Sequence, residues 1–263
     1  MKVLIASALL LFSGLGIFAQ ASYQLATPLM KFESGFFTKE ALVDLQFRFT
    51  GSQIRYTLNG EEPKVSDHLY KGPVKIKKSF TTIKAKVFSQ GFLPSETVSA
   101  TFIRDGIKVR QAIFPEADKR FPGSGPATLI DNKGGKPDKG NSTWLGYQDD
   151  SVEVVLQLEK TERVNKVLVD LLEDHGSWVF LPEKIEVFYN DPETGELRPF
   201  GILQIPAEKV IPGARCEYKL IEANQPVKTN KIKIRLSVLK SMPESHPGNG
   251  KKSWIFIDEI KVY

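Results

Sequence analysis

The last stretch of the chain carries two acidic residues inside an otherwise apolar segment. Residues 251–263 read KKSWIFIDEIKVY, so that apolar side chains flank Asp258 and Glu259 on both sides. Such a segment is typical of a buried strand, in which an unpartnered carboxylate is costly. A cation is the expected partner, and further oxygen ligands are available upstream at Asp131 and in the segment 141–144, NSTW. The pattern predicts a cation site that ties an early loop to the last strand.

A second set of residues has the chemistry of a ligand-binding loop. The segment 173–178 reads EDHGSW, which places His175 close to Trp178. Small-molecule sites combine aromatic surface with a few polar groups that fix the orientation of the ligand. The loop at 241–253, which contains His246, could lie beside this segment at one end of the fold. The alternative is that Trp178, the first residue of the apolar run WVFLP, only fills the end of a core.

Catalytic chemistry has no comparable support. The acidic pairs at 61–62, 149–150 and 173–174 are adjacent in the chain, and adjacent strand residues point to opposite faces. A glycosidase needs two carboxyl groups that face one bond across about 5–9 Å. The chain has 3 histidines and no Gly-x-Ser-x-Gly sequence, so a hydrolase triad is not supported either. We therefore expect that the protein is not an enzyme.

The first residues predict export. Met1 and Lys2 precede an apolar run over residues 3–18, and the residues at 19–21, AQA, match a signal-peptidase cleavage pattern. We expect a signal peptide over residues 1–21 and a mature chain in the periplasm, at the cell surface or outside the cell. The run is too short for a membrane span, and no second long apolar segment follows it.

Charge and cysteine content exclude further classes. The chain has 36 Lys and Arg against 31 Asp and Glu, a formal charge of +5 that falls by one when Lys2 is removed with the signal peptide. Acidic and basic residues are mixed along the chain, so we expect no nucleic-acid partner. Cys216 is the single cysteine, so no intrachain disulfide forms and the fold depends on its apolar core.

Short alternating runs dominate the pattern of apolar residues. They occupy residues 43–49, 83–87, 152–158, 167–171 and 232–238, and Gly, Pro, Asn and Asp separate them. Helical spacing is almost absent. The pattern predicts an all-β chain of two β-sandwich domains, over residues 22–102 and 103–263, which we expect to be separable near residues 103–105. Every candidate site residue lies in the second domain.

The first domain resembles a known family. The segments IRYTLNGEEP at 54–63 and TIKAKVF at 82–88 are similar to the immunoglobulin-like domain at the C-terminal side of bacterial chitobiases and β-hexosaminidases, over residues 27–102. Asn59 stands where that family more often has Asp, and both residues tolerate the turn before Gly60. In the family this domain is mainly structural, so the resemblance implies no ligand residues here.

The second domain resembles the discoidin-like, coagulation-factor type C domains, which have a galactose-binding-like jelly roll. The resemblance rests on LID at 129–131, Trp144, and DEIKV at 258–262. In that family an Asp, a Ser or Thr two positions before the Trp, and the Glu of the last strand bind one structural calcium ion. The resemblance implies that Asp131, Ser142 and Glu259 do so here. Asn132 replaces the usual Gly, and residues 133–140 form an insertion.

Both domains, in this order, are similar to the tails of exported bacterial β-hexosaminidases. The segments at 175–182 and 246–260 carry this closer resemblance. The catalytic barrel of those enzymes needs about 250 residues of alternating strand and helix, and the chain has no room for it. We therefore expect an exported, non-catalytic carbohydrate-binding or cell-surface accessory protein that binds a glycan through Trp178, His175 and His246. The alternatives are a remnant or accessory subunit of a hexosaminidase, and a structural module that binds another exported protein.

Overall fold

The computed structural model describes residues 23–140, 143–206 and 210–263. The expected signal peptide and Ser142 lie outside the described residues. Within these ranges the protein is all-β, as predicted, and its only helices are two short 3₁₀ turns, η1 (Thr128–Ile130) and η2 (His175–Ser177). No helix in this part of the chain is long and apolar enough to cross a bilayer.

The first sandwich (β1 to β8) has two facing sheets. One sheet has the order β1-β3-β6 and the other β2-β8-β7-β4-β5. Alternating side chains of β3 and β7 point between the sheets, where Val43, Ile83 and Phe102 are among the buried residues. The strands are β1 Leu29–Lys31, β2 Phe36–Phe37, β3 Ala41–Gln46, β4 Gln53–Thr57, β5 His68–Leu69, β6 Val74–Ile76, β7 Thr81–Phe88 and β8 Val98–Arg104.

The second sandwich (β9 to β15) is built on two long strands, β11 and β14. Its strand order is β10-β15-β11-β14-β12-β13, with β9 also paired to β11. Two register shifts interrupt the pairing of β11 with β14, and such irregularities let a long strand bend and contribute to both layers. The strands are β9 Val109–Ile113, β10 Leu145–Tyr147, β11 Ser151–Glu173, β12 Lys184–Asn190, β13 Leu197–Gln204, β14 Arg215–Ser237 and β15 Ile255–Val262.

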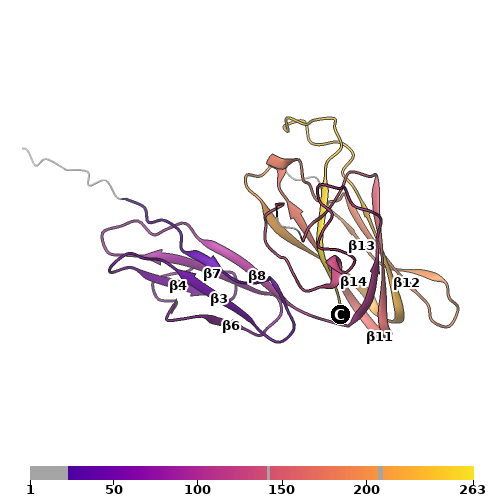
Figure 1. Ribbon diagram of the computed structural model, residues 1–263, viewed down its shortest axis with the longest axis horizontal. Helices are drawn as coiled ribbons and strands as arrows, with labels where there is room; N and C mark the ends of the chain where they lie inside the picture. The colour runs from indigo at the N-terminus through magenta and orange to yellow at the C-terminus, as the bar shows by residue number, and fades with distance from the viewer. Residues whose placement is uncertain (1–22, 141–142, 207–209) are drawn as a thin grey trace, which may run out of the picture.

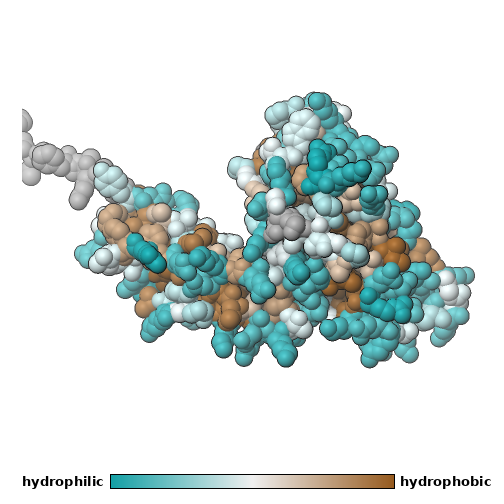
Figure 2. All heavy atoms as spheres, viewed as in Figure 1, coloured by the Kyte–Doolittle hydropathy of each residue, from teal (hydrophilic) through white to brown (hydrophobic). Residues whose placement is uncertain are grey.

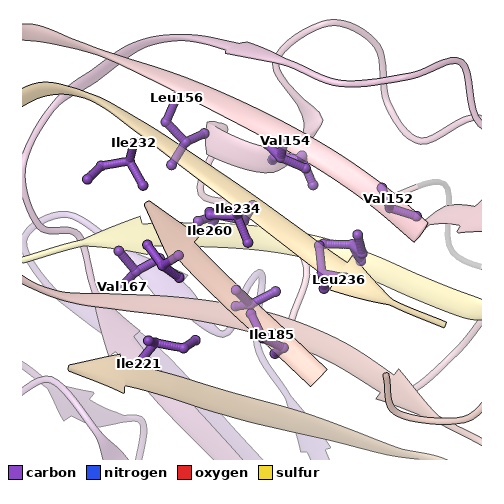
Figure 3. Packing of buried hydrophobic residues seen from close by; sticks show 14 of the residues in the cluster. Val152, Val154, Leu156, Val167, Ile185, Ile221, Ile232, Ile234, Leu236 and Ile260 are labelled. Atoms are coloured by element: carbon purple, nitrogen blue, oxygen red, sulfur yellow. The ribbon is translucent and has the colours of Figure 1, made fainter. Parts of the chain in front are cut away.

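The core of the second sandwich lies between these layers (Figure 3). Val154 of β11 pairs with Ile234 of β14, and Ile185 of β12 pairs with Leu236. All four are fully buried, and each buried aliphatic side chain contributes about 1.5–3 kcal/mol relative to exposure. The apolar residues that alternate at 152–158 and 232–238 are therefore the ones that point into the core.

The closing strand β15 lies between β10 and β11 and is buried along its whole length. Ile257 and Ile260 both face the core although they are three residues apart, because Asp258 and Glu259 together lie opposite the single residue Asp170 of β11. This bulge explains how the strand carries two acidic residues without turning its apolar residues out of the core.

The two sandwiches lie side by side and are joined next to the C-terminus (Figure 1). Phe36 and Ile103 of the first sandwich pack with Leu168 of the second, and Gly35 N donates a hydrogen bond to Gly134 O at 2.9 Å. The segment at 103–105 is thus part of a packed interface rather than a free linker. That the two domains separate there stays a prediction.

Candidate functional site

The loop end of the second sandwich contains the predicted ligand residues. The turn η2 is followed by Trp178, whose backbone is left-handed with φ of 67° and whose N–H donates to His175 O. Trp254 N donates to Trp178 O at 2.8 Å, which fixes this loop against the start of β15. The indole is half-buried, and Lys251 Nζ lies 5.2 Å from its ring centroid. Trp178 therefore presents part of an aromatic face beside a cation.

His175 is close to Trp178 but is buried. Its Nδ1 accepts a hydrogen bond from Ile211 N at 3.0 Å, which places the ring hydrogen on Nε2, 2.9 Å from Glu173 Oε1. The imidazole stacks on Phe180 with ring centroids 4.1 Å apart. Arg215 holds the other oxygen of Glu173. These contacts give His175 a structural role in holding the loop, and direct contact with a ligand stays a prediction.

His246 joins the same cluster from the loop that precedes β15. Its Nε2 lies 2.9 Å from His175 O, and Gly248 N donates to its Nδ1 at 3.0 Å. The ring meets Trp178 edge to face, with centroids 6.1 Å apart. The structure thus brings the three predicted residues together, as expected from the two loops. Of the three, only Trp178 is not buried.

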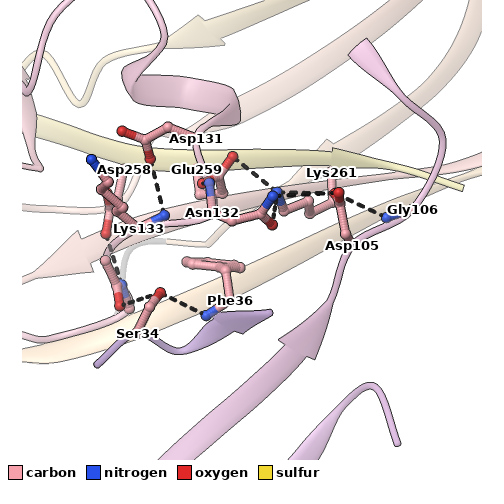
Figure 4. A network of polar contacts seen from close by, with 12 residues as sticks. Ser34, Phe36, Asp105, Gly106, Asp131, Asn132, Lys133, Asp258, Glu259 and Lys261 are labelled. Carbon is pink, nitrogen blue, oxygen red and sulfur yellow. Dashed lines mark hydrogen bonds and ion pairs between the residues drawn. The ribbon is translucent and has the colours of Figure 1, made fainter. Parts of the chain in front are cut away.

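Two of the predicted cation ligands, Asp131 and Glu259, lie farther along β15, beside the first sandwich (Figure 4). Glu259 is fully buried, and its Oε2 accepts a hydrogen bond from Asn132 N at 2.7 Å. Lys261 Nζ lies 3.1 Å from Glu259 Oε1 and 3.3 Å from Asp105 Oδ1, and it donates to Asn132 Oδ1 at 2.7 Å. We call Asp105, Asn132, Glu259 and Lys261 the junction cluster.

Asp131 and Glu259, the two implied calcium ligands among the described residues, do not form a good calcium site. Both oxygens of Glu259 have partners in the junction cluster, and one of these is the ammonium of Lys261. Asp131 accepts hydrogen bonds from Lys133 N at 2.9 Å and Ser124 Oγ at 2.9 Å. The lysine therefore already supplies the positive charge that Glu259 needs. The calcium site at Asp131, Ser142 and Glu259 stays a prediction.

Burial shifts the titration of the acidic residues of β15. It raises the pKa of Glu259 to about 8, against the opposing effect of Lys261, and it raises the pKa of Asp258 to about 7. In the unfolded chain both groups titrate near their ordinary values of about 4. Between these limits the folded protein therefore binds more protons than the unfolded chain.

This proton difference predicts that stability falls as the pH rises. In calcium-free buffer we expect the free energy of unfolding to decrease by at least about 1 kcal/mol between about pH 5 and about pH 8. Urea denaturation at each pH measures it. A Glu259→Gln variant should show a smaller decrease, because one of the buried titrating carboxyl groups is gone. A flat profile would mean that both carboxylates are ionised and compensated in the fold.

A cleft of about 1010 Å³ lies between the sandwiches. Its lining comes from β1, β8, the loop at 135–137 and the start of β14, and it includes Lys31, Phe32, Lys136 and Tyr218. Figure 2 shows a notch between the two lobes on one face of the molecule. A cleft of this kind depends on how two domains meet, which no local pattern reports.

Comparison with known proteins supports the first domain most directly. Residues 32–100 match the family described as the chitobiase/beta-hexosaminidase C-terminal domain, which confirms the resemblance read from the sequence. The match covers most of the first sandwich. Among curated proteins, none matches the chain.

Three solved structures are distantly similar to the second part of the chain in percentage identity and TM-score. A family 32 carbohydrate-binding module from Streptococcus pneumoniae EndoD is 14% identical, with a TM-score of 0.39 over 60% of this chain and 96% of that chain. A module of this type from a family 31 glycoside hydrolase of Clostridium perfringens is 16% identical, with a TM-score of 0.36 over 58% and 92%. A structure of reduced XRCC1 bound to the DNA pol beta catalytic domain is 14% identical, with a TM-score of 0.36 over 60% of this chain and 97% of that chain. The architecture of the second sandwich is therefore given by its own strand order.

Proposed function

We propose that the protein is an exported, non-catalytic carbohydrate-binding accessory protein. The observation that carries this proposal is the match of residues 32–100 to a domain named for chitobiases and β-hexosaminidases. That domain is followed by a second sandwich, and the described residues contain no barrel of alternating helices and strands. The arrangement favours a protein that brings glycan recognition, without hydrolysis, to the cell surface or its surroundings.

The loop end of the second sandwich is the best position for the glycan. Trp178 offers a half-buried indole, and Lys251 lies close enough to that ring to contact a bound ligand. His246 meets the ring edge to face, and the hydrogen bond from Trp254 N to Trp178 O holds the backbone that carries it. A rigid aromatic surface binds with little loss of side-chain entropy, which is an advantage for a sugar-binding site.

A glycan array probed with the purified chain tests this function and identifies the ligand class. For a glycan bound on the array, Trp178→Ala should weaken binding about tenfold or more, since truncation of a central aromatic contact costs about 2 kcal/mol. Phe49, an exposed aromatic residue of the first sandwich, provides the matched control, and Phe49→Ala should leave binding unchanged. Equal effects of the two substitutions would place the glycan elsewhere.

The rival classes give different results in the same preparation. A hexosaminidase remnant would release chromophore from a chromogenic N-acetylhexosaminide, and this turnover would change with a point mutation. A structural module would bind no glycan but would co-purify with another exported protein. Our proposal expects glycan binding without turnover.

A further inference from the structure

The edge of β8 that faces β2 is covered along only part of its length. β8 has 7 residues, whereas β2 has 2 and pairs only with Ile103 and Arg104. Ile103 N donates to Gly35 O at 2.8 Å, so the backbone groups of Ile103 point toward β2. Because this direction alternates along a strand, the backbone groups of Ser99 and Thr101 point to the same side. No strand of the described residues pairs with them there.

This uncovered edge borders the cleft between the two sandwiches. Residues 98–101 of β8 line it, together with residues 27–32, which include the edge strand β1 of the facing sheet. The second sandwich contributes the loop at 135–137 and the start of β14. The volume of about 1010 Å³ lies at the upper end of the range for ligand sites, about 300–1000 Å³. The cleft therefore has room for several residues of an extended chain.

Close contact between two glycines holds the walls of the cleft in place. A Cβ atom added at Gly135 would lie only 3.1 Å from the Cα atom of Gly35 in the other domain. Gly135 N donates to Asp258 Oδ2 at 2.8 Å, and Trp144 Nε1 donates to Lys136 O at 3.3 Å. The loop at 135–137 is thus fixed to the second sandwich on one side and packed on the first on the other. A preformed cleft binds with a smaller loss of conformational entropy.

The charged residues that line the cleft are all basic. They are Lys31, Lys136 and Arg215, and no acidic residue is among the lining residues. Arg215 forms ion pairs with Glu173 and Glu217, so its charge is compensated within the second sandwich. The two lysines, one from each sandwich, therefore determine which charge the cleft attracts.

Neither lysine has an ion pair with a carboxylate in the described ranges. Lys31 lies opposite Asp44 on β3, but both oxygens of Asp44 accept hydrogen bonds from other side chains. Lys136 Nζ lies 5.2 Å from the ring centroid of Phe32, which gives it an aromatic contact but no negative charge. An occupant with carboxylate groups would complement both ammonium groups.

We propose that the cleft binds an extended acidic segment of a partner protein, which adds a strand to β8 beside Ser99 and Thr101. The main chain of the segment pairs with the uncovered edge, and its carboxylates lie near Lys31 and Lys136. A sugar or a simple anion can pair with the lysines, but an extended peptide also matches the regular spacing of the N–H and C=O groups along the edge. The inference goes beyond the proposed glycan binding and is independent of it.

A library of random linear peptides displayed on phage, selected on the immobilised full chain, tests the proposal. We expect the selected sequences to be rich in Asp, Glu and strand-forming residues. One selected peptide is then synthesised and its affinity measured by isothermal titration. N-methylation of every second amide should abolish binding in one of the two alternating series and not in the other, because only one series of amides faces β8.

Four variants locate the bound peptide on the protein. Lys31→Glu and Lys136→Glu should each weaken binding about fivefold or more, since an ion pair becomes a repulsion between like charges. Lys133→Glu makes the same change at an exposed residue of the same loop, outside the cleft lining, and should have little effect. Ser99→Pro removes an N–H that points into the cleft without removing a bond to β7, and should abolish peptide binding but not glycan binding.

Several results would overturn the proposal. Selected peptides without acidic residues, or equal losses in Lys133→Glu and Lys136→Glu, would show that the lysines of the cleft do not recognise the ligand. Equal effects of the two N-methylated series would exclude strand addition, and this measurement needs only the unmodified chain. Loss of glycan binding in Ser99→Pro would make the cleft a sugar site instead. Self-association of the chain that Ser99→Pro abolishes would make a second copy the occupant.

Discussion

Lys261→Met should lower the free energy of unfolding by about 3–5 kcal/mol, the usual cost of removing one partner from a buried ion pair. The side chain of Lys261 is only 3% exposed, and its ammonium contacts Glu259, Asp105 and Asn132. Methionine keeps the length of the side chain but leaves Glu259 without its cation, so that this buried group must either carry an uncompensated charge or bind a proton. Because Asp105 directly follows β8, the same substitution also removes an ion pair between the two sandwiches.

Urea denaturation measures this loss, and two variants separate its causes. Lys160 is 78% exposed and pairs with Glu162 at 3.2 Å, so Lys160→Met should cost no more than about 1 kcal/mol. Glu259→Gln combined with Lys261→Met removes the uncompensated charge and should recover part of the stability. If the double variant is as unstable as Lys261→Met alone, the charge of Glu259 is not what Lys261 compensates.

Sequence periodicity was sufficient for the fold class because both long strands of the second sandwich alternate regularly. Val154 and Ile234 are paired and buried as their positions in the alternating runs predict. The closing strand was also predicted to be buried, because residues on both of its faces are apolar. These features depend only on local spacing, which the chain shows directly.

The junction cluster could not be predicted in the same way. On the alternation of β15, Lys261 belongs to the outer face of the sheet, which usually means solvent. Here the first sandwich and the loop at 131–137 cover that face, so that Lys261 and Glu259 are buried together. Burial at this position follows from contacts between residues far apart in the chain, such as Gly35 with Gly134 and Asn132 with Glu259.

For the predicted ligand residues, the sequence shows the types of side chain but not the contacts that each of them makes. The sequence correctly indicated that two loops carrying aromatic and imidazole side chains could meet. It did not report that Phe180 stacks on His175 or that Ile211 donates to the same ring. Asp170 carries no local signal, because a single acidic residue in the run VLVDLLE resembles one polar position of a strand.

Gly134→Ala should destabilise the protein by about 2–4 kcal/mol, as the sum of backbone strain and overpacking. Gly134 has a φ of 111°, and its Cβ would overlap the carboxylate of Asp258. Gly125 is the matched control, because its φ of 116° is nearly the same but nothing lies within 4 Å of an added Cβ. Gly125→Ala should therefore show only the strain, about 1–2 kcal/mol.

The difference between the two glycine variants isolates the contact of the loop with Asp258. Urea denaturation gives this difference, and hydrogen exchange at Gly35 reports on the interface, because the Gly35 amide donates to Gly134 O. In Gly134→Ala the loop must move away from Asp258, so this amide should exchange faster than in Gly125→Ala. Equal stability losses with unchanged exchange at Gly35 would mean that the loop does not pack on the buried acidic residues. The cover over Asp170 and Asp258 would then be too loose to exclude water from them.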